Sequence, residues 1–473
     1  MEDTPPNLLF IVLDSVRADH TSIHNCGRQT TPFLETLSKD AYVFKNAFAA
    51  APWTPPSHAS MFLGSYPSKH GYFEGGDSLN STHPTLAETL NAEEYRTFGA
   101  VRNWHIDSQK EVTQGFQEFE DIYRLPEFPG SISEFKQKYI DLLPGYLKIA
   151  SKMLNTSQKP SDYISCEYIK QRMSDGDDPF FGFINIAAPH SPYLPPEPYR
   201  SQFESFDKES TDMDLVRLLS CVDGNGWQEF TAGKIDSQEG EEVWSAVKDW
   251  YAGEIRFSDV LVEQLVERLH NLGVYDNTMI IVTSDHGEHF GEHDRASHQF
   301  SLFDELLHVP LLIKPPNTTE HNFTSAERLV SLVDLFPTIL SEFDLPVPES
   351  VDGINIFSSY KRKKIFAEYK LPAMVKSGLQ ESVPEIDKEI RQDLFRSLQC
   401  VRTNQHKLIK SDEGPDRFYE VGEESPKDRL TADIDRQSLQ SMISNTLDDE
   451  FSDTHHKSLD SKSRENLEGL GYI

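Results

Sequence analysis

The residues best suited to do chemistry in this 473-residue chain lie in one short segment, Thr283 to Glu288. It follows the apolar run Met279–Val282, which has the length and composition of a buried central strand. Open α/β sheets bind ligands beyond the carboxyl ends of their strands. Asp285 and His286 are adjacent at such an end, where both side chains can turn toward one divalent cation. The segment therefore predicts a metal site.

Three other apolar runs of strand length also end in polar residues. These runs and the residues that follow them are Leu8–Leu13 before Asp14, Thr97–Val101 before Asn103 and His105, and Phe180–Ile186 before His190. Continuous apolar runs are typical of parallel strands that are covered on both faces. We therefore expect each of these polar residues at the end of a buried strand.

Thr54 precedes two prolines and a run of small and apolar residues that stops at Gly64. This pattern predicts a loop that feeds a short helix, with Thr54 just before its first residue. Capping the helix is the commoner function of a threonine in this place. A catalytic function needs support from the rest of the site.

The element pattern predicts an α/β protein with a mostly parallel sheet flanked by helices. We expect residues 1–346 to form the main domain, with insertions at about 120–178 and 200–245, and residues 200–240 to be irregular. A helix over Tyr251–Leu272, a strand over Val309–Ile313 and a helix over Val330–Leu340 kinked at Pro337 are expected within it. Short alternating runs beyond residue 347 predict a C-terminal subdomain, 347–473, with a small antiparallel sheet and a terminal helix.

Composition limits the function classes. With 77 acidic and 45 basic residues the formal charge is −32, which argues against binding nucleic acid or anionic membranes and suggests a halophilic source. Four cysteines without paired spacing indicate neither a zinc ribbon nor a disulfide framework. No run approaches the roughly 20 apolar residues of a membrane-spanning helix, and the acidic N-terminal residues do not resemble a signal peptide. We expect a cytoplasmic protein.

Six motifs in their order and spacing carry a family resemblance. They are Asn7–Asp14, Pro56–Ser60, Asn103–His105, Pro189–Tyr193, Thr283–Glu288 and Leu302–Pro310. The chain resembles the sulfatase family of the alkaline-phosphatase-like superfamily from Asn7 to about Gly353. The resemblance implies a mixed, mostly parallel central sheet and hydrolysis of a small anionic ester.

The chain departs from true sulfatases at several family positions. Those enzymes carry a cysteine in a Cys-x-Pro-Ser-Arg motif that is oxidised to formylglycine, and Thr54 stands at its position, with His58 at that of the arginine. Ser15 replaces a second acidic residue, and Asn103 and Gln299 replace lysines. The substitutions favour branches that use unmodified threonine: phosphodiesterases, phosphonate monoester hydrolases and phosphoethanolamine-type transferases.

The resemblance implies a ligand set for a divalent ion: Asp14, Asp285, His286 and Thr54 through its hydroxyl oxygen. The imidazole nitrogen favours zinc or manganese, with calcium as an alternative. Thr54 would attack phosphorus or sulfur in line and form a covalent intermediate that water cleaves.

The remaining catalytic candidates are His190, His298, His105 and Asn103, which would bind non-bridging oxygens or protonate the leaving group, and His58, which would support Thr54. A second metal at His190 and His298 is left open. The neighbouring His289, His293 and His308 are expected to be solvated.

The leading expectation is thus a metal-dependent hydrolase of phosphodiester, phosphonate monoester or sulfate ester bonds. Two alternatives remain at this point. One is a catalytically inactive scaffold that binds an anionic ligand, and the other is a phospho-group transferase. The sequence does not indicate the oligomeric state.

Overall fold

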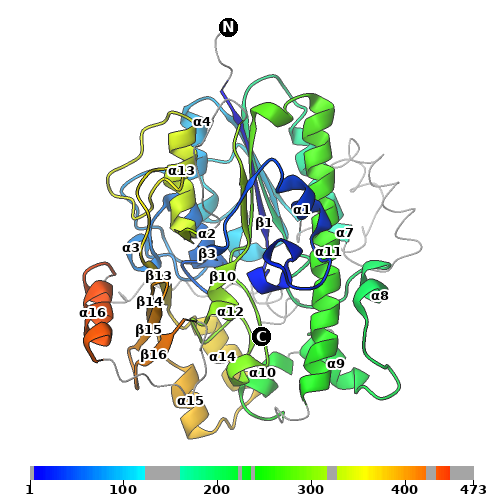
Figure 1. Cartoon of the computed structure of the whole chain (residues 1–473), viewed down its shortest axis with the longest axis vertical. Coiled ribbons are helices and arrows are strands. Elements are labelled where there is room, and N and C mark those ends of the chain that lie inside the picture. The colour runs from blue at the N-terminus through cyan, green and yellow to red at the C-terminus, as the bar shows by residue number, and fades with distance from the viewer. Residues whose placement is uncertain are drawn as a thin grey trace.

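A computed structural model describes residues 5–122, 160–221, 226–235, 240–316, 327–421 and 433–447. Its centre is a seven-stranded sheet in the order β2-β11-β7-β1-β6-β4-β5 (Figure 1). The strands are β1 Asn7–Leu13, β2 Tyr42–Val43, β4 Arg96–Val101, β5 Glu118–Asp121, β6 Phe180–Ile186, β7 Thr278–Thr283 and β11 Leu311–Lys314.

The middle of the sheet is parallel because its strands are apolar on both faces. Every residue of β1, β6 and β7 is buried, and β1 pairs in parallel with both neighbours, so that Leu8 lies opposite Phe181 and Met279. β11 runs antiparallel to β7, which makes the sheet mixed. The expected fold class, α/β with a mostly parallel sheet, is confirmed.

Helices cover both faces of the sheet. α2 (Thr54–Leu63), α4 (Leu86–Ala92) and α13 (Leu335–Glu342) pack together on one face, and α1 (Pro32–Leu37), α7 (Pro160–Arg172) and α11 (Gly240–Leu272) lie on the other (Figure 1). α11 is longer than the predicted Tyr251–Leu272, and it leads through a short 3-10 turn into β7. None of the helices in the described ranges is long and apolar enough to cross a membrane.

Three local predictions are wrong. Val309–Ile313 is two strands, β10 (His308–Val309) and β11, which belong to different sheets. The predicted helix over Val330–Leu340 begins as β12 (Leu329–Ser331), which pairs with β3 (Asn46–Phe48). Pro337 lies in the first turn of α13, where the missing N–H has no intrahelical partner to lose, so it does not kink the helix.

The third error concerns residues 200–240, which were expected to be irregular. Their described part contains three short helices, α8 (Tyr199–Phe203), α9 (Met213–Leu219) and α10 (Gly226–Thr231). Most of the other expected insertion, 120–178, lies outside the described residues.

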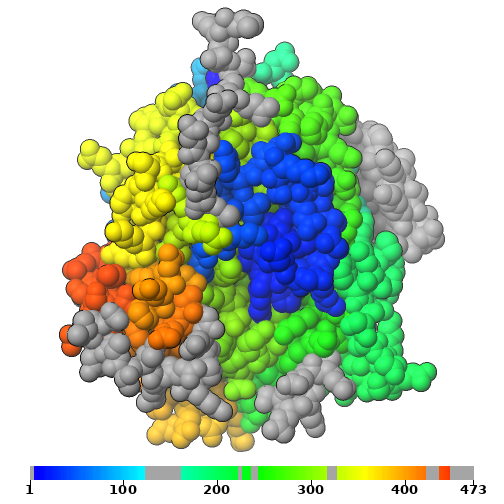
Figure 2. Space-filling model, in the orientation of Figure 1, coloured from blue at the N-terminus to red at the C-terminus, as the bar shows by residue number. Residues whose placement is uncertain are grey.

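The C-terminal region forms an antiparallel sheet, β13 (Ile365–Tyr369), β14 (Leu398–Arg402), β15 (His406–Ser411) and β16 (Arg417–Glu420), covered by α16 (Asp433–Ser444). It packs directly on the main domain, since the Glu368 N–H donates to the Ala50 carbonyl at 2.9 Å and Glu368 Oε2 accepts from the Ser68 N–H at 2.7 Å. In Figure 2 the orange C-terminal segment lies beside the blue and green segments of the main domain.

Candidate metal and catalytic site

The site is built where the two central strands end. β1 and β7 are parallel neighbours, with Val12 opposite Thr283, so that Asp14 and Asp285 emerge side by side. Ser15 turns the chain with a left-handed φ of 62° and donates its N–H to Asp285 Oδ1 at 3.1 Å. This bond joins two loops that are 270 residues apart and fixes the Asp285 carboxylate next to Asp14.

The carboxylates of Asp14 and Asp285 and the imidazole of His286 converge. One ligand atom from each lies within 4.8 Å of the others, and all three side chains are fully buried. His286 Nε2 is 3.4 Å from Asp285 Oδ2 and 3.8 Å from Asp14 Oδ1. Ligands bound roughly 2.1 Å from one ion lie on the order of 3.0–3.5 Å apart, so these separations suit a shared cation.

The tautomer of His286 supports the same conclusion. Its Nδ1 lies 2.9 Å from the Gly287 carbonyl oxygen, which can only accept, so Nδ1 carries the proton. Nε2 then presents a lone pair to two carboxylates. An unprotonated imidazole nitrogen that faces two carboxylates forms a ligand set that a divalent ion fits.

A cation would also compensate the charges of the buried carboxylates. Burial and, next to it, the charge of Asp14 raise the pKa of Asp285 well above its ordinary value. Burial would raise the pKa of Asp14 too, but the surrounding histidines outweigh it and hold that pKa low. Burial lowers the pKa of His286, which keeps the ring neutral and able to ligate.

Thr54 is the first residue of α2 rather than the residue before it. The N-cap is Trp53, and no side chain caps this helix. The Thr54 hydroxyl instead faces the ligand set, with Oγ1 3.4 Å from His286 Nε2. Asn103 Nδ2 donates to Thr54 Oγ1 and to Asp14 Oδ2, each at 3.3 Å. Asn103 therefore holds both the hydroxyl and one carboxylate.

His58 lies behind Thr54 in the next turn of the same helix. Its Nδ1 donates to the Thr54 carbonyl oxygen at 3.0 Å and lies 3.7 Å from Asp285 Oδ2. Burial lowers its pKa to about 4, so the ring is neutral at pH 7. The structure thus brings His58 to Thr54, and its supporting role stays a prediction.

His190 and His298 lie over the ligand set. The His298 ring is 4.4 Å from the His286 ring and 5.1 Å from the His190 ring, centroid to centroid. Burial holds the pKa of His298 well below its ordinary value. In the described residues, Asp14, Asp285 and His286 form the one group of three clustered ligand residues, and the second metal left open for His190 and His298 stays a prediction.

Glu288 is a site residue to which sequence reasoning assigned no role. It is 1% exposed, it accepts a hydrogen bond from the Tyr193 hydroxyl at 2.8 Å, and His298 Nδ1 lies 3.4 Å from its carboxylate. Burial raises its pKa to about 7. Its place two residues after His286 in the opening motif was the available indication.

His105 lies at the edge of the site. Its ring contacts Trp53 and Trp104, with centroids 5.3 and 4.0 Å away, and its backbone N–H donates to Asn103 Oδ1 at 3.0 Å. In this arrangement His105 helps to orient Asn103 and the residue before Thr54.

The expectation that three further histidines are solvated is wrong. His289 is 1% exposed and bonded to Ser301 at 2.7 Å, while the His293 ring stacks on Phe303 and the His308 ring on Phe48. Tertiary packing buries His289 and half-buries His293 and His308.

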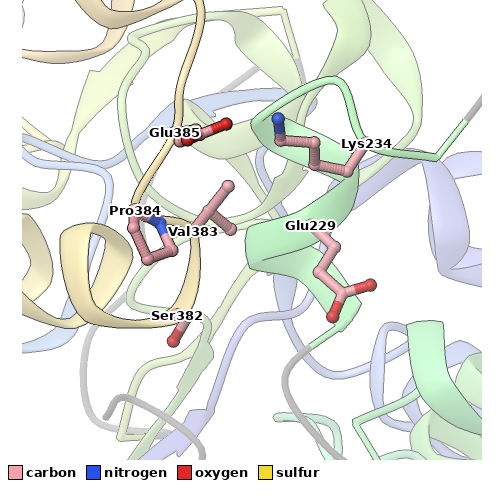
Figure 3. A pocket seen from close by; sticks show the side chains of 6 residues that line it. All are labelled: Glu229, Lys234, Ser382, Val383, Pro384 and Glu385. Carbon is pink, nitrogen blue, oxygen red and sulfur yellow. The ribbon is translucent and has the colours of Figure 1, made fainter.

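A surface hollow of about 430 Å³ lies away from these residues, between α10 and the segment after α14 (Ala373–Ser382). Figure 3 shows Glu229 and Lys234 on one side and Val383, Pro384 and Glu385 on the other. It contains none of the ligand or nucleophile candidates, so it is not the reaction site.

Comparison with known proteins gives a consistent picture. The sequence model of the sulfatase family matches residues 6–345. An ulvan-active sulfatase of Formosa agariphila is 24% identical over 458 residues, which cover 93% of this chain and 80% of that protein. Arylsulfatase K of Bos taurus is 23% identical over 478 residues, covering 93% of this chain and 82% of that protein.

Two solved structures share the fold. A phosphonate monoester hydrolase of Agrobacterium radiobacter superposes with a TM-score of 0.67 at 21% identity, covering 93% of this chain and 94% of the other. A protein in complex with its substrate D-glucosamine-2-N,6-O-disulfate gives a TM-score of 0.65 at 16% identity, covering 95% and 100%.

Proposed function

Because the chain belongs to the sulfatase family and is an ester hydrolase, we propose that it cleaves sulfate, phosphonate monoester or phosphodiester bonds with Thr54 as nucleophile and a divalent metal ion. The observation that carries the proposal is the position of Thr54 Oγ1, 3.4 Å from His286 Nε2, the nitrogen that in turn faces the Asp14 and Asp285 carboxylates.

The ligand set fits a single divalent ion held by Asp14, Asp285, His286 and Thr54. Such an ion, when bound, would lower the pKa of the Thr54 hydroxyl and neutralise the paired carboxylates. The imidazole ligand favours zinc or manganese over calcium.

The protein's own groups prepare the nucleophile. The Asn103 side-chain amide donates a hydrogen bond to Thr54 Oγ1, and this bond fixes the orientation of the hydroxyl. His58 holds the Thr54 carbonyl and thereby the first turn of α2. A nucleophile fixed in this way needs little further ordering before it reacts.

In the proposed reaction Thr54 gives its hydroxyl proton to a histidine, its Oγ1 forms a bond to sulfur or phosphorus, and the bond to the leaving alcohol oxygen breaks. His298, whose ring lies 4.4 Å from the His286 ring, and His190, whose ring lies 5.1 Å from that of His298, would take up this proton and transfer it to the leaving oxygen. Water then hydrolyses the ester on Thr54 and restores the hydroxyl.

Relatives motivate the substrate panel. The named sulfatases and the phosphonate monoester hydrolase point to sulfate and phosphonate esters. A threonine that cannot become formylglycine favours the phosphorus esters. The panel is an aryl sulfate, an aryl phosphonate monoester and a bis-aryl phosphodiester, each measured with zinc, manganese and calcium.

The test compares Thr54→Ala with Thr54→Ser. We expect Thr54→Ala to lower kcat by at least about a thousandfold, as expected when a nucleophile is removed, while Thr54→Ser keeps a hydroxyl and substantial activity. Thr36→Ala, at an exposed site, is the control. Mass spectrometry of quenched wild-type enzyme is expected to find the adduct on the Thr54 peptide. Full activity of Thr54→Ala would refute the proposal, and a metal-loaded protein inactive on all three esters would favour the scaffold.

A further inference from the structure

We propose that Glu288 is a positioning residue that holds the His298 ring in one orientation and one tautomer. The inference rests on the proposed function, in which His298 contacts the ester. Glu288 is a buried carboxylate outside the clustered ligand set. The proposal gives it a role.

The Glu288 carboxylate faces His298 Nδ1 with both of its oxygens. His298 Nδ1 is 3.4 Å from both Glu288 oxygens, Oε1 and Oε2. Both side chains are at most 2% exposed, so water does not compete for this contact. A carboxylate that faces Nδ1 selects the ring flip and places the proton on that nitrogen. Nε2, on the other side of the ring, then carries the lone pair that can take up a proton and pass it to the leaving oxygen.

Glu288 is itself held by a second group. The Tyr193 hydroxyl donates to Oε2 at 2.8 Å, and the Tyr193 ring is buried against Tyr251 and Phe290, with centroids 5.6 and 5.8 Å away. A rigid donor of this kind fixes the carboxylate, which in turn fixes the imidazole.

The same carboxylate joins two loops of the site. Tyr193 follows His190 by three residues in the loop after β6, and Glu288 precedes the hairpin of β8 (His289–Phe290) and β9 (Ala296–Ser297), after which His298 comes directly. The Tyr193–Glu288–His298 chain therefore sets the distance between the loops that carry the two histidines, whose rings are 5.1 Å apart.

Kinetics of Glu288→Ala and Glu288→Gln test the role. We expect Glu288→Ala to lower kcat about 10–100-fold, as loss of an orienting partner typically does, with KM changed far less. Glu288→Gln keeps an oxygen that accepts from Nδ1–H, so it is expected to restore most of kcat. Tyr193→Phe, which removes only the hydroxyl, gives a smaller loss, and Glu93→Ala at an exposed site gives none.

A double-variant cycle shows whether Glu288 acts through His298. If it does, Glu288→Ala combined with His298→Ala is no slower than His298→Ala alone. The inference is overturned if the two substitutions lower kcat by factors that multiply in the double variant. It is also overturned if Glu288→Ala keeps kcat within twofold of wild type, or if Glu288→Ala binds less metal.

Nitrogen-15 NMR of the histidine rings supplies a readout that needs no activity. The resonances that disappear in His298→Ala identify this ring, which is expected as the Nδ1–H tautomer in wild type and as a mixture with the Nε2–H tautomer in Glu288→Ala. The same tautomer in both proteins would refute the inference. Wild-type protein that hydrolyses none of the esters would refute the proposed function instead, and the tautomer would still decide the role of Glu288.

Discussion

Asp285→Asn should stabilise the metal-free protein while abolishing metal binding. The Asp14 and Asp285 ligand atoms lie within 4.8 Å of each other. Two unit charges at about 4.8 Å repel by roughly 3 kcal/mol at an effective dielectric constant of about 20. Asparagine removes this repulsion and keeps an oxygen for the Ser15 N–H, which now bonds Asp285 Oδ1 at 3.1 Å.

The pH dependence of this effect has a definite sign. Burial and the Asp14 charge raise the pKa of Asp285 in the folded protein, so the folded state binds more protons than the unfolded state above about pH 4. The free energy of unfolding of chelator-treated wild type therefore falls as pH rises. Asp285→Asn lacks this loss, and its advantage is expected to grow from pH 5 to about 2–3 kcal/mol at pH 8.

Urea unfolding with chelator, and then with excess zinc or manganese, measures both effects. Metal at about 100 times its Kd should stabilise wild type by about 2.7 kcal/mol and Asp285→Asn far less, so the order of stability reverses. Asp177→Asn, at an exposed position, should change neither value. The reasoning fails if Asp285→Asn is less stable than wild type in chelator at pH 8, or if metal stabilises both equally.

Two further substitutions test how the site is held. Gly287→Ala should abolish activity and destabilise the fold, because a Cβ there would lie 1.9 Å from the Glu305 carbonyl oxygen, whereas Gly76→Ala meets nothing within 4 Å and should be silent in both assays. Asp304→Asn should lower the free energy of unfolding by about 2 kcal/mol at pH 7, as measured by urea unfolding. Burial by itself would raise the pKa of Asp304, but the charges of Lys407 and Arg402 lower it to about 2. Its contribution is present above about pH 4 and is lost as pH falls toward 2, so equal losses at pH 7 and pH 2 would contradict this reading.

Much of the sheet could be predicted from the sequence because buried parallel strands are apolar throughout. β1, β6 and β7 were predicted within one residue at each end for this reason. Short strands such as β12 could not be, because Leu329–Ser331 owes its conformation to pairing with β3, which lies about 280 residues earlier. Propensity and periodicity do not carry that information.

The residues of the candidate site also differ in whether local sequence patterns could predict them. Asp14, Asp285 and His286 were recognisable because a polar residue directly after a buried strand is a local pattern. Glu288 and the buried His289 were not, because burial depends on which loops pack over them. A carboxylate in the sequence looks the same whether it is solvated or enclosed.

By itself the sequence determined which polar residues follow the central strands, because the change from apolar to polar residues occurs within a few consecutive positions. Only the tertiary structure decided that Asp14 and Asp285, 271 residues apart, converge on one site, because β1 and β7 are neighbours in the sheet. It also decided the direction of the Thr54 hydroxyl, which turns to His286 instead of capping α2. Such choices depend on contacts between distant segments, and those contacts exist only in the folded chain.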